Sequence, residues 1–245
     1  MNILAVIPAR YASTRFPGKP LAKIFGRPLI EWVLRAVEES QFVDEIIVAT
    51  DHREIAETVK KIGGYVVLTP SQIPSGTDRV AYVAKEKNFN IVINVQGDEP
   101  LLKGYMIDLL AKTMLENPNI EIATLVRHPL EEEIFSPNSV KVVADSNLFA
   151  LYFSRAPIPC IFRGERNREY YWCHIGIYCF RKDILMKFVS LTKSKLEILE
   201  NLEQLRALEN GISIKLVPVK DITHPVDVPS DIEIIEEIIK KQMQK

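Results

Sequence analysis

Short apolar segments alternate with longer mixed segments along the first half of the chain. Four of the apolar segments are rich in β-branched side chains: residues 2–7, 45–49, 65–68 and 91–95. Such runs are typical of strands that are buried on both faces. Helices are expected between them, beginning at Pro28 and covering about 53–62 and 77–87. This alternation predicts an α/β fold with a mostly parallel central sheet and helices on both faces.

The second half has a less regular pattern. Strands are expected at 120–126, 140–144, 148–153, 174–180 and 212–217, and helices at about 183–189, 202–209 and 229–241. No low-complexity linker separates the two halves. We therefore expect one domain over 1–245, with a smaller inserted lobe at about 127–175.

Composition and charge exclude several classes of protein. Lysine and arginine total 31 and aspartate and glutamate total 32, so a general nucleic-acid binder is not expected. No apolar run reaches the roughly 18 residues of a membrane span, and the first residues lack the pattern of a secretory signal. These features predict a cytoplasmic protein. Three cysteines without C-x-x-C spacing are expected to be free thiols.

In parallel sheets ligands bind beyond the carboxyl ends of the strands. This rule selects residues 9–19, 50–51 and 96–100. The first of these segments contains Arg10, Arg15 and Lys19, three cations that suit a triphosphate. A solvated basic loop is the alternative interpretation. The segment matches neither the P-loop nor the dinucleotide-binding glycine pattern.

Two aspartates are candidate magnesium ligands. Asp98 follows an apolar strand directly, and Asp227 precedes the last predicted helix. Magnesium commonly takes one or two carboxylates, with phosphate oxygens and water as its other ligands. The alternatives are a turn aspartate at Asp98 and a helix-starting aspartate at Asp227, although Asp231 could serve that second role instead.

Eight segments spread over nearly the whole chain form a recognisable set. They are PARYASTRFPGKPL at 8–21, ATD at 49–51, SGTDR at 75–79, NVQGDEP at 94–100, YFSR at 152–155, HIGIY at 174–178, LEQLR at 202–206 and VDVPSD at 226–231. In this order they resemble the 3-deoxy-manno-octulosonate cytidylyltransferase family, the CMP-Kdo synthetases. The resemblance implies a nucleotide-diphospho-sugar transferase fold of the GT-A-like type with a smaller dimerisation lobe. It also implies transfer of CMP from CTP to 3-deoxy-D-manno-octulosonate (Kdo), for lipopolysaccharide core synthesis.

The resemblance assigns roles to individual residues. The implied CTP-binding residues are Ala9, Arg10, Ser13, Arg15, Lys19, Ser75, Gly76 and Gln96. The implied catalytic residues are Arg10, Arg15, Lys19, Asp98 and Asp227, the last two as magnesium ligands. The implied sugar-binding residues are Gln96, Arg155, His174, Tyr178, Glu203 and Gln204, with Arg155 suited to the sugar carboxylate.

Each assignment has a plainer alternative. Ser75 and Gly76 could form a turn before a helix capped at Thr77, and His174, Tyr178 and Gln204 could be ordinary core or helix residues. The partners implied are CTP, Kdo and a second copy of the chain, with neither nucleic acid nor membrane.

Other activities on a related fold remain as alternatives. The first is the same reaction on 8-amino-Kdo, and the second is a CTP-binding module without turnover. A CMP-sialic acid synthetase is disfavoured, because the stretch after Arg10 lacks the glycine normal in that family. A sugar-phosphate nucleotidyltransferase is disfavoured, because its glycine-rich loop is absent.

Overall fold

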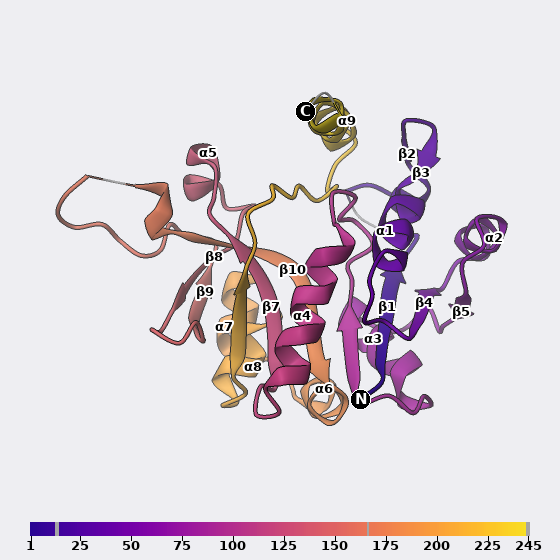
Figure 1. Ribbon diagram of the computed structural model, residues 1–245, viewed down its shortest axis with the longest axis horizontal. Helices are drawn as coiled ribbons and strands as arrows, with labels where there is room; N and C mark the ends of the chain where they lie inside the picture. The colour runs from indigo at the N-terminus through magenta and orange to yellow at the C-terminus, as the bar shows by residue number, and fades with distance from the viewer. Residues whose placement is uncertain (13–14, 166, 244–245) are drawn as a thin grey trace.

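A twisted nine-stranded sheet runs through the part of the chain that the structure describes (Figure 1). The structure is a computed structural model, and it describes residues 1–12, 15–165 and 167–243. The strands of this sheet are β1 (Ile3–Ala9), β4 (Glu45–Thr50), β5 (Val66–Leu68), β6 (Ile91–Asn94), β7 (Ile122–Arg127), β8 (Lys141–Ala144), β9 (Ala150–Ser154), β10 (Trp172–Arg181) and β11 (Ile214–Pro218). A separate small sheet pairs β2 (Lys23–Ile24) with β3 (Arg27–Pro28).

The main sheet has the order β11-β7-β10-β6-β1-β4-β5, and β8 and β9 extend from β10. β1 is parallel to both β4 and β6, and β4 to β5. β10 lies between β6 and β7 and is antiparallel to both. All seven residues of β1 are buried, as expected for a strand that is covered on both faces. The prediction of a mostly parallel α/β sheet is confirmed.

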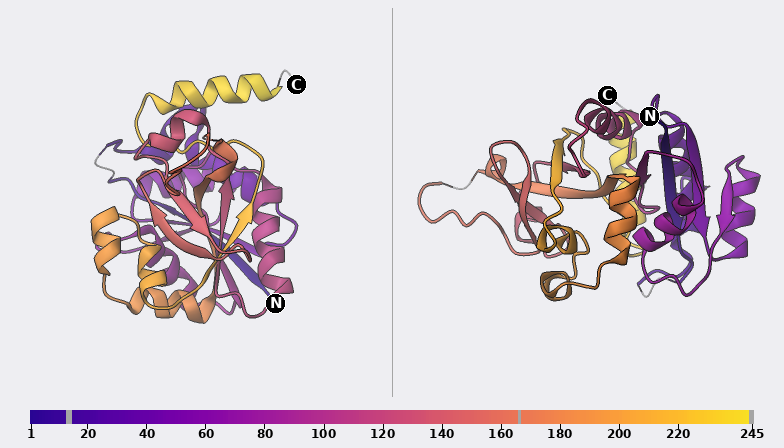
Figure 2. Two further views of the ribbon diagram at one scale, coloured as in Figure 1. Left: turned by 90° about the vertical axis from the view of Figure 1, so that its left-hand side faces the viewer. Right: turned by 90° about the horizontal axis from the view of Figure 1, so that it is seen from below.

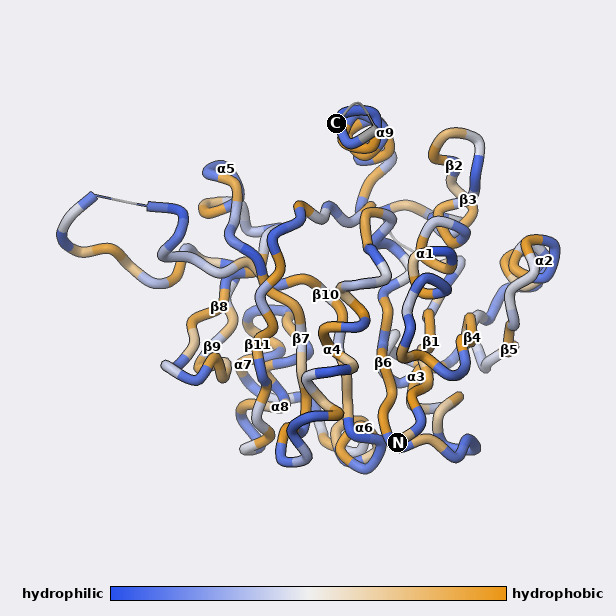
Figure 3. Tube along the Cα trace, in the orientation of Figure 1, coloured by the Kyte–Doolittle hydropathy of each residue, from blue (hydrophilic) through white to orange (hydrophobic). Residues whose placement is uncertain are grey.

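Helices cover both faces of the sheet. They are α1 (Leu29–Glu38), α2 (Arg53–Lys61), α3 (Gly76–Lys85), α4 (Gly104–Glu116), α5 (Glu131–Phe135), α6 (Lys182–Ser190), α7 (Lys195–Glu200), α8 (Leu205–Glu209) and α9 (Asp231–Met243), with 3₁₀ turns η1 (Lys19–Leu21) and η2 (Arg168–Tyr170). One core cluster joins α1, α2 and α4 to the sheet, and the other joins α3, α6 and α8 to it. Figure 3 shows the hydrophobic central strands between helices that have a polar side.

Several helix predictions were incomplete. α4, α5 and α7 were not predicted, and the helix expected at 202–209 is only Leu205–Glu209. The backbone of Asn201 is left-handed, with a φ of 51°, and this ends α7 before α8 begins. The alternative in which Thr77 caps the helix is not observed, because Ser75 caps α3 by accepting a hydrogen bond from the Asp78 N–H.

The region 127–175 contains α5, β8, β9 and the long connection toward β10. The connection projects away from the sheet (Figures 1 and 2). β8 nevertheless pairs with β10, so this region shares the main sheet. The division into one domain with an inserted lobe stays a prediction. Within the described residues, no helix is both long and apolar enough to span a bilayer.

Candidate active site

The loop after β1 is shaped by a tight backbone turn. The Gly18 N–H donates to the Tyr11 carbonyl across 2.9 Å, and the Gly18 φ of 70° is one that glycine adopts without strain. A side chain at this position would begin 3.3 Å from the Tyr11 ring. The turn leads directly into η1, whose first residue is Lys19. This turn therefore directs the Lys19 side chain back toward the ends of β1 and β6.

A second glycine brings Asp98 to the same place. A Cβ on Gly97 would lie 2.9 Å from the Pro8 carbonyl oxygen, closer than packed atoms tolerate. Only glycine therefore lets the segment after β6 pass so near the end of β1. Asp98 is the next residue, and its carboxylate lies 2.6 Å from the Lys19 ammonium.

Lys19 also joins Asp98 to the carboxy-terminal segment. Its ammonium donates to the Val226 carbonyl across 2.7 Å and lies 4.0 Å from an Asp227 oxygen. The Val226 N–H donates to the Asp98 carbonyl across 2.8 Å. The Arg15 guanidinium adds an ion pair with Asp227 at 2.9 Å. Residues more than 200 positions apart in the chain thus meet in one charged cluster.

Asp231 caps the last helix, which leaves the Asp227 side chain to face the cluster. The Asp231 Oδ2 atom accepts hydrogen bonds from the N–H groups of Asp227 and Val228, at 2.6 and 2.9 Å. Asp231 is also the first residue of α9. The helix-starting role belongs to Asp231, as the alternative interpretation allowed.

One cavity of about 420 Å³ opens beside this cluster. Its lining residues are Pro8, Ala9, Arg10, Ala12, Arg15, Lys19, Pro20, Gly76, Gln96, Gly97 and Asp98. We call it the nucleotide cavity, after the prediction that its residues bind CTP. It includes six of the eight residues predicted to bind CTP. Ser75 does not line it and bonds to Asp78 and Glu203 instead, while Ser13 lies outside the described residues.

A second cavity, of about 460 Å³, lies on the other side of the cluster. It is lined by Arg15, Gln96, Asp98, Glu99, Arg127, Glu132, Glu133, Ser136, Asn138, Ser139, Val140, Cys173, His174, Gly176, Thr223, His224, Pro225, Asp227, Val228 and Asp231. We call it the sugar cavity, after the prediction that Gln96 and His174 bind the sugar. Arg15, Gln96 and Asp98 line both cavities. These three side chains mark the place where a group bound on one side meets a group bound on the other.

The predicted sugar-binding residues fall into three places. Gln96 and His174 line the sugar cavity. Burial lowers the pKa of His174 to about 3, so its imidazole is neutral near pH 7. Its Nε2 atom lies 3.0 Å from the Thr124 hydroxyl, which also donates to the Ile177 carbonyl. His174 therefore offers a neutral ring that is fixed by its own hydrogen bond.

Tyr178, Glu203 and Gln204 gather instead around a small space beside Thr77. The Glu203 carboxylate accepts from the hydroxyls of Thr77 and Ser75, at 2.7 and 3.1 Å. Burial raises the pKa of Glu203 and of Tyr178. A chain of hydrogen bonds links this group to the cavities: Gln96 donates to Asn94, Asn94 to Thr77 and Thr77 to Glu203.

Arg155 lies on neither cavity. Its guanidinium donates to the carbonyls of Pro137, Glu200 and Asn201, at 2.7, 2.8 and 3.2 Å. The structure thus places it behind the wall of the sugar cavity, on main-chain acceptors. Its expected contact with a sugar carboxylate stays a prediction.

Two buried charged residues of the sugar cavity were not predicted. Glu99 is 5% exposed, and its Oε2 atom has no hydrogen-bond partner among the described residues. Burial, together with the charge of Asp98, raises the pKa of Glu99 to about 8. Arg127 lies in the same wall and forms a two-bond ion pair with Glu133, at 2.5 and 2.7 Å. The sequence could have indicated Glu99, because it directly follows Asp98. It gave no comparable signal for Arg127 or Glu133.

The carboxylates of Asp98 and Asp227 fit a magnesium ion whose other ligands come from a substrate. Asp98 and Asp227 both reach the Lys19 ammonium, so their oxygens lie close together. Over residues 1–12, 15–165 and 167–243, no three His, Cys, Asp or Glu side chains gather to hold a metal by themselves. This donor set matches magnesium, which is commonly held by one or two carboxylates plus substrate phosphates.

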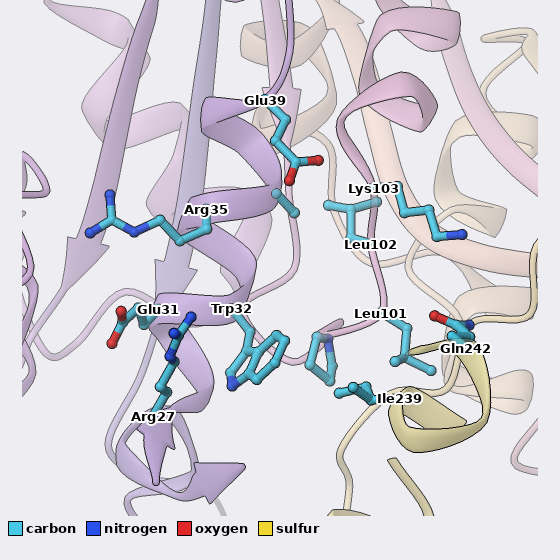
Figure 4. Close-up of a pocket in the computed structure, with 12 residues that line it drawn as sticks. Arg27, Glu31, Trp32, Arg35, Glu39, Leu101, Leu102, Lys103, Ile239 and Gln242 are labelled. Carbon is cyan, nitrogen blue, oxygen red and sulfur yellow. The ribbon is translucent and has the colours of Figure 1, made fainter. Parts of the chain in front are cut away.

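A further cavity of about 290 Å³ lies between α1 and α9 (Figure 4). Trp32, Leu101 and Ile239 form its apolar floor, with Arg27, Glu31, Arg35, Glu39 and Lys103 around it. It contains none of the predicted site residues. Arg35 and Lys103 are already paired with Glu38 and Asp221, so the charges around this cavity do not converge on a ligand.

The chain is similar to proteins of one family along most of its length. The cytidylyltransferase family profile matches residues 4–222. A 3-deoxy-manno-octulosonate cytidylyltransferase of Thermodesulfovibrio yellowstonii is 46% identical, over 98% of this chain and 98% of the relative. One of Geobacter sulfurreducens is 44% identical, over 98% and 100%. The solved structure of a CMP:2-keto-3-deoxy-manno-octonic acid synthetase complexed with CTP has a TM-score of 0.91 and 37% identity, and the match covers 99% of this chain and 100% of that one.

Proposed function

Because the chain belongs to the 3-deoxy-manno-octulosonate cytidylyltransferase family, we infer that it transfers CMP from CTP to Kdo and releases pyrophosphate. One observation supports this most directly: the nucleotide cavity and the sugar cavity share Arg15, Gln96 and Asp98. A two-substrate transfer needs such a junction, because the attacking and leaving groups must be held in line.

The reaction makes and breaks one bond to phosphorus. The anomeric hydroxyl oxygen of Kdo bonds to the α-phosphorus of CTP, and the bond from that phosphorus to the bridging oxygen breaks. The electron pair leaves with pyrophosphate, and the hydroxyl proton is lost to solvent. Arg10, Arg15 and Lys19 line the nucleotide cavity, where they neutralise the charge that moves onto pyrophosphate.

We propose magnesium as the cofactor, with Asp98 and Asp227 as its protein ligands. When bound, magnesium would supply a Lewis acid toward the phosphate oxygens. The chain's own contribution is to fix the two carboxylates. It does so through the bond from the Val226 N–H to the Asp98 carbonyl and through the cap that Asp231 provides.

Substrate recognition is divided between the two cavities in this proposal. The nucleotide contacts Ala9, Arg10 and Gly76. The cytosine amino group can donate hydrogen bonds to backbone carbonyls there. Gln96 and His174 contact sugar hydroxyls. Glu203 acts on Gln96 through the chain of hydrogen bonds described above, and Tyr178 and Gln204 lie beside Glu203.

The direct test is pyrophosphate release with CTP and magnesium, with Kdo, 8-amino-Kdo and sialic acid offered separately. We expect release with Kdo, and loss of release when a chelator removes the metal. Release only with 8-amino-Kdo would keep the chemistry and change the assigned sugar. CTP binding without release for any sugar would contradict the proposed function and favour a binding module.

We further propose a homodimer that acts in the cytoplasm, where CTP is available. Apolar side chains are exposed on the region 127–175, with Leu151 at 62%, Tyr170 at 57% and Phe162 at 86% exposure. Such exposure is typical of a surface that another protein covers. Light scattering should give a mass near twice that of the 27.9 kDa chain, and Phe162→Glu should lower it. A monomeric unmodified protein would contradict the dimer.

A further inference from the structure

A lysine is fully buried behind the sugar cavity. Lys141 on β8 has a relative exposure of 0%. Its ammonium donates to the carbonyls of Ser136 and Ser139, at 2.6 and 2.5 Å. No ion pair with a carboxylate is found for it in the described part of the chain. Burial of an ammonium is costly, and here two main-chain carbonyls compensate it.

The carbonyls held by Lys141 belong to a loop that forms one wall of the sugar cavity. Ser136, Asn138, Ser139 and Val140 all line that cavity. Two neighbouring carbonyls of the loop are also occupied: Pro137 accepts from Arg155 across 2.7 Å, and Val140 accepts from the His174 N–H across 2.8 Å. Four of its five carbonyls are therefore bonded to protein groups.

This arrangement determines which groups the loop can offer to a ligand. With those carbonyls engaged, Asn138 and Ser139, which line the cavity, can still offer an amide and a hydroxyl. An amide and a hydroxyl can each donate and accept hydrogen bonds. They suit a polyhydroxylated acid, and the same cavity contains Asp98 and Asp227 from the opposite wall.

We propose that Lys141 is a positioning residue for the sugar: it fixes the 136–140 loop so that Asn138 and Ser139 meet the sugar hydroxyls. This inference rests on the proposed function, because it assumes that the second cavity receives Kdo. Lys141 itself does not touch substrate. A shift of about 1 Å in such a wall can cost roughly a hundredfold in rate.

The chain offers a matched control. The Lys182 ammonium also donates to two main-chain carbonyls, those of Lys85 and Lys87, and it lies on neither cavity. We would compare Lys141→Met with Lys182→Met, because each change removes one ammonium from two carbonyls and keeps a long apolar side chain. Melting curves of both variants report the loss of stability, and steady-state kinetics report the KM for each substrate.

The expected result is an increase of about tenfold or more in the KM for Kdo in Lys141→Met, with the KM for CTP unchanged. Lys182→Met should leave both KM values unchanged. Lys141→Arg keeps the donors and should recover part of the loss. Equal KM values for Kdo in Lys141→Met and Lys182→Met would overturn the inference, as would equal increases in both KM values.

A second pair of variants keeps the test decisive if Lys141→Met does not fold. Asn138 is exposed, so Asn138→Ala should fold, and Ser139→Ala is a small change at the same wall. Each should raise the KM for Kdo and not that for CTP, and unchanged values in both would overturn the inference. Failure of the unmodified enzyme to release pyrophosphate would instead contradict the proposed function itself.

Discussion

The nucleotide cavity and the sugar cavity are neighbours, yet they are built in different ways. On the nucleotide side, Arg10, Lys19 and Asp98 lie in loops that directly follow the parallel strands β1 and β6. On the sugar side, the walls come from distant segments that are joined by buried charged groups, such as Arg127, which donates to the Thr223 carbonyl. The difference suggests that the first side is a fixed phosphate site, while the second depends on supports behind its surface.

The largest expected effect is at Asp98, one of the three residues that line both cavities. Asp98→Asn should lower kcat about a hundredfold or more, because it removes charge opposite the phosphates and weakens the proposed metal site. Asp221→Asn is the matched control, since Asp221 also pairs with a lysine, Lys103, but lies outside both cavities. Both variants should keep the far-UV spectrum of the unmodified protein. Near-normal turnover in Asp98→Asn would contradict its role.

Arg155→Ala tests whether the sugar side depends on groups behind its wall. We expect the KM for Kdo to rise by roughly tenfold to a hundredfold, with a smaller change for CTP, since a charge-assisted hydrogen bond contributes about 1.5–3 kcal/mol. Arg181→Ala is a close control, because its guanidinium also donates to three carbonyls, those of Ile120, Met114 and Asn117. Steady-state kinetics with each substrate varied in turn would give the KM for Kdo and the KM for CTP in both variants. Equal increases for both substrates in Arg155→Ala would remove the assignment to the sugar.

Gly76→Ala tests the nucleotide side with one methyl group. The new Cβ would lie 3.4 Å from Pro8 Cγ and 3.6 Å from Gln96 Oε1, so the chain should still fold. The methyl group would occupy space in the nucleotide cavity, and we expect the KM for CTP to rise about tenfold. The KM for Kdo should stay the same. A larger change for Kdo than for CTP would reverse the assignment of the two cavities.

The smallest effect concerns stability and not turnover. The pKa of His174 is about 3 in the folded protein, against roughly 6.5 in an unfolded chain. Between these values the unfolded chain binds a proton that the folded one does not. His174 therefore lowers the free energy of unfolding as the pH falls from about 6.5 toward 3. Between pH 7 and pH 5, urea unfolding should show a larger decrease in the free energy of unfolding for the unmodified protein than for His174→Gln. Equal losses would contradict a buried neutral imidazole.

The same difference explains how much of the site the sequence could predict. Arg10, Lys19 and Asp98 were found because a rule connects strand ends to ligand sites. Lys141 and Arg127 were not found, because neither lies in the strand-end segments that this rule selected, 9–19, 50–51 and 96–100. Arg127 meets the Thr223 carbonyl, for example, across 96 positions of sequence. The fold followed from the alternation of strands and helices, but α4 was missed although it packs six buried residues under the sheet.

If one cavity binds the nucleotide and the other binds the sugar, changes at the two cavities should affect the two substrates separately. The most direct test is to measure the KM for CTP and for Kdo in Gly76→Ala, in Lys141→Met and in the double variant. We expect a crossed result: Gly76→Ala raises only the KM for CTP, Lys141→Met raises only that for Kdo, and the double variant shows both increases without further loss. Increases in both KM values in each single variant would contradict separate sites for the two substrates.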